Sequence, residues 1–289
     1  MGAIALFFQS LALGLVQGLT EFIPISSSAH LVIVPWLFGW TDPALDSLTF
    51  DVALHLGTLV AVIVFFAPDW QRLIVAWFRS IFRLKIDDNP DTLMAWWLLL
   101  ACIPGAIIGV LFEGAVTASF HVMPIPRLSM VLMAAAIAAL GMLLLLADRL
   151  GKVERGFSEI RFVDALLIGC AQALAIFPGV SRSGATITAG LALGLKRETA
   201  ARFSFLLSAP IIAGAGLKSL YELLSGIRGG AIQSTELIIF PVGFLAAAVS
   251  GFFCIKVLLT FLQRHSTRAI VFYRWGLAAL VLVVAFLRG

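Results

Sequence analysis

Two polar segments interrupt apolar stretches of this chain, and together they carry residue types that could bind a phosphate group and attack it. The first is Gly14–His30 (GLVQGLTEFIPISSSAH) and the second is Gly169–Thr186 (GCAQALAIFPGVSRSGAT). They match without a gap at the offset that separates Gln17 from Gln172, which pairs glycine, glutamine, leucine, phenylalanine and two serines. An acid and a histidine in one copy and an arginine in the other indicate a composite anion-binding site.

The first segment contains a carboxylate and three consecutive hydroxyls. Glu21 lies in an apolar stretch, where a carboxylate is costly unless it is paired or functional. Gln17 precedes it by four residues, so the two share a helix face. Ser26, Ser27 and Ser28 follow Pro24, and a helix that starts there would offer hydroxyls and free N–H groups to a phosphate. The alternative for each serine is a capping role alone.

His30 lies three residues after Ser27, a spacing that predicts contact between the two side chains on a helix. A neutral imidazole could take the serine proton or attack phosphorus itself. Glu21 could orient that imidazole and stabilise its charged form. The alternative is a structural histidine, and the residues leave the identity of the nucleophile open.

The second segment contributes a guanidinium. Arg182 lies between Ser181 and Ser183, and Thr186 follows at i+4. A guanidinium can bind two phosphate oxygens with parallel hydrogen bonds. We therefore predict that Arg182 and these hydroxyls bind phosphate, with a purely structural pair to Glu21 as the alternative.

Other candidates are weaker. Asp51 and His55 are spaced i,i+4 and His55 could line a cavity. The sequence has no P-loop, no HExxH and no cysteine cluster, so no motif demands a metal. Glu21 beside a diphosphate could nevertheless hold Mg²⁺ or Ca²⁺.

The composition is that of an integral membrane protein. The 289 residues are 61% hydrophobic and 12% charged, with a mean hydropathy of +1.05. A soluble domain could not keep that much apolar surface from water. The net charge of +4 predicts no nucleic-acid partner, because the basic residues lie in short loops.

Long apolar runs indicate where the chain crosses the bilayer. A crossing needs about 20 residues. Two further stretches are apolar but are broken by proline and serine, which end one helix and cap the next. The six unbroken runs are 45–67, 93–111, 127–147, 203–221, 236–257 and 270–287, and the broken stretches are 3–38 and 162–195.

Basic residues predict the orientation. By the positive-inside rule, four clusters of arginine and lysine are cytoplasmic. Both termini are then outside, and each broken stretch enters the membrane and turns back. Arg72–Lys85 lies in an expected loop near 69–92 and Arg149–Arg161 in an expected loop near 148–161; the other two clusters are Lys196–Arg202 and Arg264–Arg274.

Each half is therefore predicted to be one re-entrant helix pair followed by three spans. Because three is odd, the second half has the opposite orientation in the membrane to the first. The expected fold is all-α and polytopic, with six transmembrane helices and two re-entrant helix pairs. It is a single membrane domain over 1–289 that contains inverted repeats over 1–150 and 160–289, with the polar breaks meeting near the midplane. The alternative is eight full spans with the serine-rich segments as loops.

Three segments resemble the undecaprenyl-diphosphate phosphatase family, also called the bacitracin-resistance family. They are QGLTEFIPISSSAH at Gln17–His30, FDVALHLGTL at Phe50–Leu59 and PGVSRSGATI at Pro178–Ile187. The resemblance covers essentially the whole chain. It implies removal of the terminal phosphate from a C55 polyprenyl diphosphate in the bacterial cytoplasmic (inner) membrane. That reaction recycles the lipid carrier for peptidoglycan, and the resemblance implies a site open to the outer face.

The resemblance also implies site residues. Glu21, Ser27, His30 and Arg182 match the family's implicated positions. The family's acidic motif is (Glu/Gln)-x-x-x-Glu, and Gln17 at its first position argues against a two-carboxylate metal site. A homodimer is left open. The rival interpretation is a transporter or flippase of the same lipid, which needs a binding site but no nucleophile.

Overall fold

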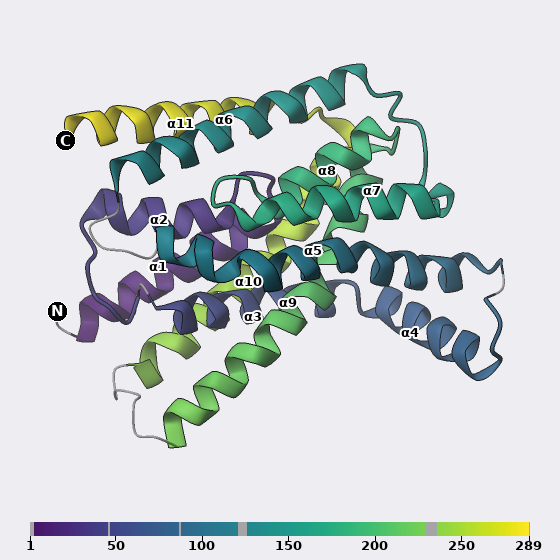
Figure 1. Ribbon diagram of the computed structural model, residues 1–289, viewed down its shortest axis with the longest axis horizontal. Coiled ribbons are helices and arrows are strands. Elements are labelled where there is room, and N and C mark those ends of the chain that lie inside the picture. Colours follow the sequence, from purple (N-terminus) through teal and green to yellow (C-terminus); the bar gives the residue numbers. More distant parts are fainter. Residues whose placement is uncertain (1–2, 46, 87, 121–125, 229–235, 289) are drawn as a thin grey trace.

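The computed structural model describes residues 3–45, 47–86, 88–120, 126–228 and 236–288. These ranges are helical, and no strand occurs within them (Figure 1). The α-helices are α1 (Ala3–Phe22), α2 (Ser27–Phe38), α3 (Leu48–Phe65), α4 (Ala67–Phe82), α5 (Pro90–Phe120), α6 (Arg127–Leu150), α7 (Phe162–Ala173), α8 (Arg182–Ala192), α9 (Arg197–Arg228), α10 (Glu236–Arg264) and α11 (Arg268–Leu287), with short 3₁₀ turns η1 (Phe157–Glu159) and η2 (Leu174–Ile176).

The long helices make the chain a multi-pass membrane protein. Among the described residues, five helices are long and apolar enough to cross a bilayer: α1, α5, α6, α10 and α11. A sixth crossing is added if α3 and α4, which meet at an angle of 82°, are counted as one broken span. Five of the six apolar runs expected from the sequence lie within helices, namely α5, α6, α9, α10 and α11. The sixth, 45–67, extends beyond both ends of α3.

One expected loop is largely helical. The segment 69–92 was predicted to be a charged cytoplasmic loop, but α4 occupies Ala67–Phe82. Pro68 and Asp69 lie in its first turn, where proline and an acid both favour a helix start. The charges that suggested a loop instead form contacts: Asp69 accepts from Arg72 at 2.5 Å and from Arg202 of α9 at 2.7 Å.

Glycines allow helices from the two halves of the chain to pack closely. A Cβ added to Gly18 of α1 would lie 2.6 Å from the Ala247 carbonyl oxygen of α10. In the other half, a Cβ at Gly169 of α7 would lie 2.5 Å from the Ala101 carbonyl oxygen of α5. Backbones this close require glycine. Each half therefore packs the helix before its polar break against a long helix of the other half.

Candidate active site

The two polar breaks have the same local geometry. Ser26 and Ser181 both lie in the left-handed region, with φ of 75° and 47°. Each side chain caps the helix that follows by accepting from the backbone N–H three residues on, and each hydroxyl also contacts the serine two residues on. Non-glycine residues in this region cost about 1–3 kcal/mol and cluster at functional sites. The cap orients Ser27 at the first residue of α2 and Arg182 at the first residue of α8.

The breaks contact one another directly. The Gly179 backbone N–H donates to Ser26 Oγ at 3.2 Å. The Ser183 hydroxyl donates to the Ile23 carbonyl oxygen at 3.4 Å. Two segments more than 150 residues apart in the chain thus form one polar centre.

A buried arginine joins the two breaks to α6. Arg274 of α11 has no exposed surface, and its guanidinium donates to the carbonyl oxygens of Pro24 (2.8 Å), Gly179 (3.0 Å) and Ile137 (2.9 Å). The prediction that Arg274 lies in a basic loop cluster was wrong, because it lies within α11 and is fully buried. Its position six residues after Arg268 resembles a loop cluster, and only the tertiary contacts reveal three backbone acceptors. Sequence reasoning therefore missed the residue that ties the site together.

Glu21 is the centre of the polar network. Its Oε1 pairs with the Arg182 guanidinium, and its Oε2 accepts from Ser27 Oγ at 2.5 Å and from Gln17 Nε2 at 3.0 Å. The carboxylate is buried, with 6% of the residue's surface exposed. The predicted i,i+4 contact with Gln17 is confirmed. The structural pair between Glu21 and Arg182 exists, and both residues also line the cavity described below.

His30 lies in a different environment from the one expected. Its Nδ1 lies 2.7 Å from the Ser26 carbonyl oxygen and its Nε2 lies 2.7 Å from the Tyr273 hydroxyl. Because a carbonyl only accepts, Nδ1 carries the proton and Nε2 accepts from Tyr273. The expected contacts of His30 with Ser27 and with Glu21 are therefore wrong for this arrangement, since α2 turns the imidazole toward α11. Sequence spacing along one helix gave no sign of Tyr273.

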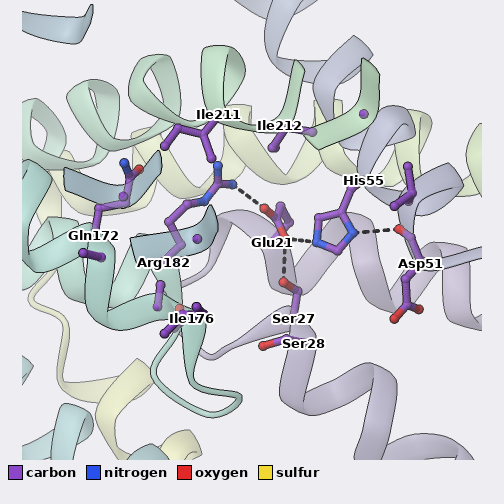
Figure 2. Close-up of a pocket in the computed structure, with 17 residues that line it drawn as sticks. Glu21, Ser27, Ser28, Asp51, His55, Gln172, Ile176, Arg182, Ile211 and Ile212 are labelled. Atoms are coloured by element: carbon purple, nitrogen blue, oxygen red, sulfur yellow. Dashed lines mark hydrogen bonds and ion pairs between the residues drawn. The ribbon is translucent and has the colours of Figure 1, made fainter. Parts of the chain in front are cut away.

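His55 takes the place beside Glu21 that was expected of His30. Its Nε2 lies 3.7 Å from Glu21 Oε2, and its Nδ1 donates to the Asp51 carbonyl oxygen at 2.7 Å. Figure 2 shows Ser27 and His55 approaching the Glu21 carboxylate from different elements, α2 and α3. The sequence signal for His55 is its i,i+4 spacing from Asp51, and it is a weaker signal than the pattern that links Glu21 and His30.

The expected phosphate-binding hydroxyls divide into two groups. Ser27, Ser28 and Ser181 line the cavity. Ser26, Ser183 and Thr186 are buried in hydrogen bonds that support the breaks, and Thr186 Oγ1 contacts Ser204 Oγ at 2.7 Å. Gln17 is also buried and contacts Glu21.

A cavity of about 350 Å³ joins these groups to apolar surface. One side is polar and holds Glu21, Ser27, Arg182 and His55 (Figure 2). The other side is lined by apolar and small residues of α5, α7, η2 and α9. They are Gly105, Gly109, Ala173, Ala175, Ile176, Ile211, Ile212 and Gly216. Such a cavity suits a ligand with an anionic head and a hydrocarbon chain.

The side chains do not form a ready-made metal site. Within the described ranges, no group of three or more histidine, cysteine, aspartate or glutamate residues is arranged to hold a metal ion. Both Glu21 oxygens already accept hydrogen bonds from Arg182, Ser27 and Gln17. A cation on Glu21 would have to displace these donors, so we derive no step through a metal.

The fold and the site define a class: a polytopic helical membrane protein with a serine, a carboxylate and a guanidinium on an amphipathic cavity. The chain belongs to the family described as Bacitracin resistance protein BacA, which it matches over residues 10–280. It is 47% identical over 280 residues to the undecaprenyl-diphosphatase of Moorella thermoacetica, covering 97% of this chain and 98% of the relative. It is 44% identical over 282 residues to that of Caldicellulosiruptor bescii, covering 98% of both. It is 43% identical over 275 residues to that of Geobacter metallireducens, covering 95% of this chain and 96% of the relative.

Proposed function

We propose that the chain is an undecaprenyl-diphosphate phosphatase, which releases inorganic phosphate from a C55 polyprenyl diphosphate and leaves the monophosphate. The observation that carries the location of this chemistry is the Ser27 hydroxyl hydrogen-bonded to Glu21, whose other oxygen pairs with Arg182, on the wall of an amphipathic cavity. Family membership and the names of the relatives support the reaction and its substrate.

Arg182 is the group that exchanges partners when substrate binds. Its guanidinium pairs with Glu21, and a second nitrogen donates to the Ser208 carbonyl oxygen at 3.1 Å. A diphosphate offers the same acceptors with greater charge, so the guanidinium moves from the carboxylate to the phosphate oxygens. Glu21 then loses its counter-ion and becomes a better proton acceptor. Ser28 and Ser181 line the cavity and supply further donors to the phosphate.

Ser27 is the nucleophile of the proposed reaction. Its Oγ forms a bond to the terminal phosphorus, its proton passes to Glu21, and the P–O–P bond breaks with the electron pair on the polyprenyl monophosphate. Water then attacks the phosphorus of the phosphoserine, the Oγ–P bond breaks, Glu21 returns its proton to Ser27 Oγ, and inorganic phosphate leaves with both hydrogens of the water. Arg182 stabilises the charge that develops on the phosphoryl oxygens.

His30 supports the first turn of α2 through the Ser26 carbonyl in this scheme. A direct role as base requires the Tyr273 hydroxyl to leave Nε2. His55 lies beside Glu21, and its imidazolium form would stabilise the carboxylate while it exchanges partners.

Orientation and symmetry are further parts of the proposal. The repeats over 1–150 and 160–289 are inverted, the termini lie outside and the cavity opens to the outer face of the bacterial inner membrane. The reciprocal packing of α1 on α10 and α7 on α5 supports the inverted arrangement. The basic clusters support the orientation.

The deciding experiment is phosphate release from C55 polyprenyl diphosphate by purified protein in detergent. We expect Ser27→Ala and Glu21→Gln each to lower kcat on the order of 10²-fold or more. Ser28→Ala, the neighbouring serine that does not contact Glu21, is the matched control and should lose less than about 10-fold. Parallel assays with EDTA and with added Mg²⁺ or Ca²⁺ test whether a cation accompanies the diphosphate.

Tight binding of the lipid without phosphate release under any metal condition would overturn the proposal. Transport of the lipid would then become the better explanation of the cavity. Near-normal activity of Arg182→Lys would argue against bidentate phosphate binding, because lysine keeps the charge and loses the fork of donors.

A further inference from the structure

The two helices on the apolar side of the cavity are less closely packed than their counterparts. In the α3–α10 pair, a Cβ at Gly57 would lie 2.3 Å from the Phe244 carbonyl oxygen. In the α5–α9 pair, a Cβ at Gly109 or at Gly214 would meet no heavy atom within 4 Å. Gly57 of α3 permits close contact with α10, whereas Gly109 of α5 and Gly214 of α9 face open space.

Glycine in an open helical position needs another explanation. It destabilises a helix interior by about 1 kcal/mol relative to alanine. Gly109 lines the cavity although nothing packs against it. An interior proline immediately precedes the first cavity residue of each helix: Pro104 before Gly105 and Pro210 before Ile211. The space beside Gly109 is therefore part of the cavity and not a contact between helices.

A buried glutamine marks the same end of the cavity. Gln172 lines the cavity and is 4% exposed, and its Oε1 has no hydrogen-bond partner. A Cβ at Gly105 would lie 3.2 Å from Gln172 Nε2, so this amide lies against α5 (Figure 2). An unpaired buried acceptor is costly, which indicates that a water or another hydrogen-bond donor reaches this point of the cavity.

The α5 surface next to this opening is apolar and exposed. Ile107 and Val110, which flank Gly109, are 53% and 85% exposed. An apolar helix face of this kind contacts lipid in a membrane protein. The cavity thus lies beside the bilayer core at Gly109.

We infer that the prenyl chain of the substrate leaves the cavity between α5 and α9, past Gly109. This inference rests on the proposed function, which supplies the amphipathic ligand. A second apolar groove is not the route we infer, because it shares no lining residue with the cavity that holds Glu21 and Arg182. Its lining includes Leu19, Ile23, Phe253 and Val257.

Photo-crosslinking tests the route independently of turnover. The probe is a C55 diphosphate with a diazirine in its first isoprene units, bound to Ser27→Ala protein so that it is not cleaved. We expect labels on residues 105–112 of α5 and 211–216 of α9. Labels at Phe253 and Val257, or a pattern identical to that of a diazirine phosphatidylcholine, would overturn the inference.

Substitutions at open glycines provide a matched test. Gly109→Trp should raise KM for the C55 substrate about 10-fold or more by filling the route, and Gly109→Leu should have a smaller effect of the same sign. Gly276→Trp of α11 is the control, since its Cβ also meets nothing within 4 Å but it lies off the cavity, and it should change KM less than about twofold. Unchanged KM in Gly109→Trp would contradict the route.

Failure of the route and failure of the proposed function give different results. Phosphate release by the native chain together with labels away from α5 and α9 rejects the route alone. Labels on α5 and α9 without phosphate release by the native chain reject the enzymatic function and leave the lipid site in place.

Discussion

Glu21 connects the two copies of the duplicated segment at the level of single residues. It accepts from Ser27 in its own copy and pairs with Arg182 of the other. A buried carboxylate without these partners would be strongly unfavourable. The same contacts that neutralise Glu21 therefore place Ser27, the proposed nucleophile, and Arg182, the proposed phosphate-binding group, on opposite sides of one carboxylate.

The two ring nitrogens of His30 have different partners, so their contributions to activity can be tested separately. Asparagine places an N–H close to the position of Nδ1 and removes Nε2. We expect His30→Asn to keep the hydrogen bond to the Ser26 carbonyl and to lose less than about 10-fold in kcat, since a single neutral hydrogen bond contributes about 1 kcal/mol. His30→Ala should lose more, because the first turn of α2 then lacks its donor.

Steady-state kinetics of these variants with Tyr273→Phe checks this prediction. A 10²-fold or greater loss of kcat in His30→Asn, together with full activity in Tyr273→Phe, would contradict it. Nε2 would then be the catalytic base, and the Tyr273 hydroxyl would only occupy that nitrogen in the absence of substrate.

At the level of helices, Arg274 holds the two breaks and α6 in one arrangement. Arg274→Met would leave the Pro24, Gly179 and Ile137 carbonyls without this donor. We expect a loss of about 2–5 kcal/mol in stability and a fall in kcat, because each unsatisfied buried acceptor costs about 1–3 kcal/mol. Arg274→Lys should recover part of both, since an ammonium keeps three donors but not their planar spread.

Thermal inactivation in detergent and kcat measured on the same preparations test this prediction. Arg268→Met is the matched control, because Arg268 is exposed in the first turn of the same helix. Equal behaviour of the Arg274→Met and Arg268→Met proteins would show that the buried contacts do not stabilise the site.

The helices were largely predictable and their contacts were not. Apolar runs of about 20 residues identified the long helices, and Pro24 and Pro178 identified the breaks, because hydropathy and proline act locally along the chain. The contact between the two breaks followed from the internal repeat. The partners of His30, His55 and Arg274 depend on how different helices rotate against one another, which local spacing does not encode. The amphipathic α4 was missed because its charges alternate with apolar residues and suggested a loop.

At the level of the whole molecule, the proposed topology predicts which loops face the cytoplasm. We expect single cysteines at Arg83 and Lys152 to be inside and one at Asp42 to be outside, in a chain whose three native cysteines are replaced. The reason is the positive-inside rule applied to the basic clusters. Labelling of intact cells or spheroplasts with a membrane-impermeant maleimide measures these positions.

Labelling of the cysteine at position 42 alone would agree with two re-entrant pairs and inverted halves. Labelling of the cysteine at position 83 or position 152 in intact spheroplasts would contradict the orientation. Cysteines at residues 25 and 180, in the two breaks, distinguish re-entrant segments from the alternative of eight full spans, because full spans would expose one of them as a surface loop.

The packing of α1 on α10 has a consequence for how the protein is made. Ser10 of α1 donates to the Ile239 carbonyl oxygen at 2.5 Å, and Cys254 of α10 donates to the Leu19 carbonyl oxygen. The ribosome synthesises α1 more than 200 residues before these partners exist. The first helix to leave the ribosome must therefore wait beside the translocon or in lipid until the last third of the chain has been inserted. A nascent chain can complete the packing that supports the end of α1, and with it Glu21, only after α10 has been inserted.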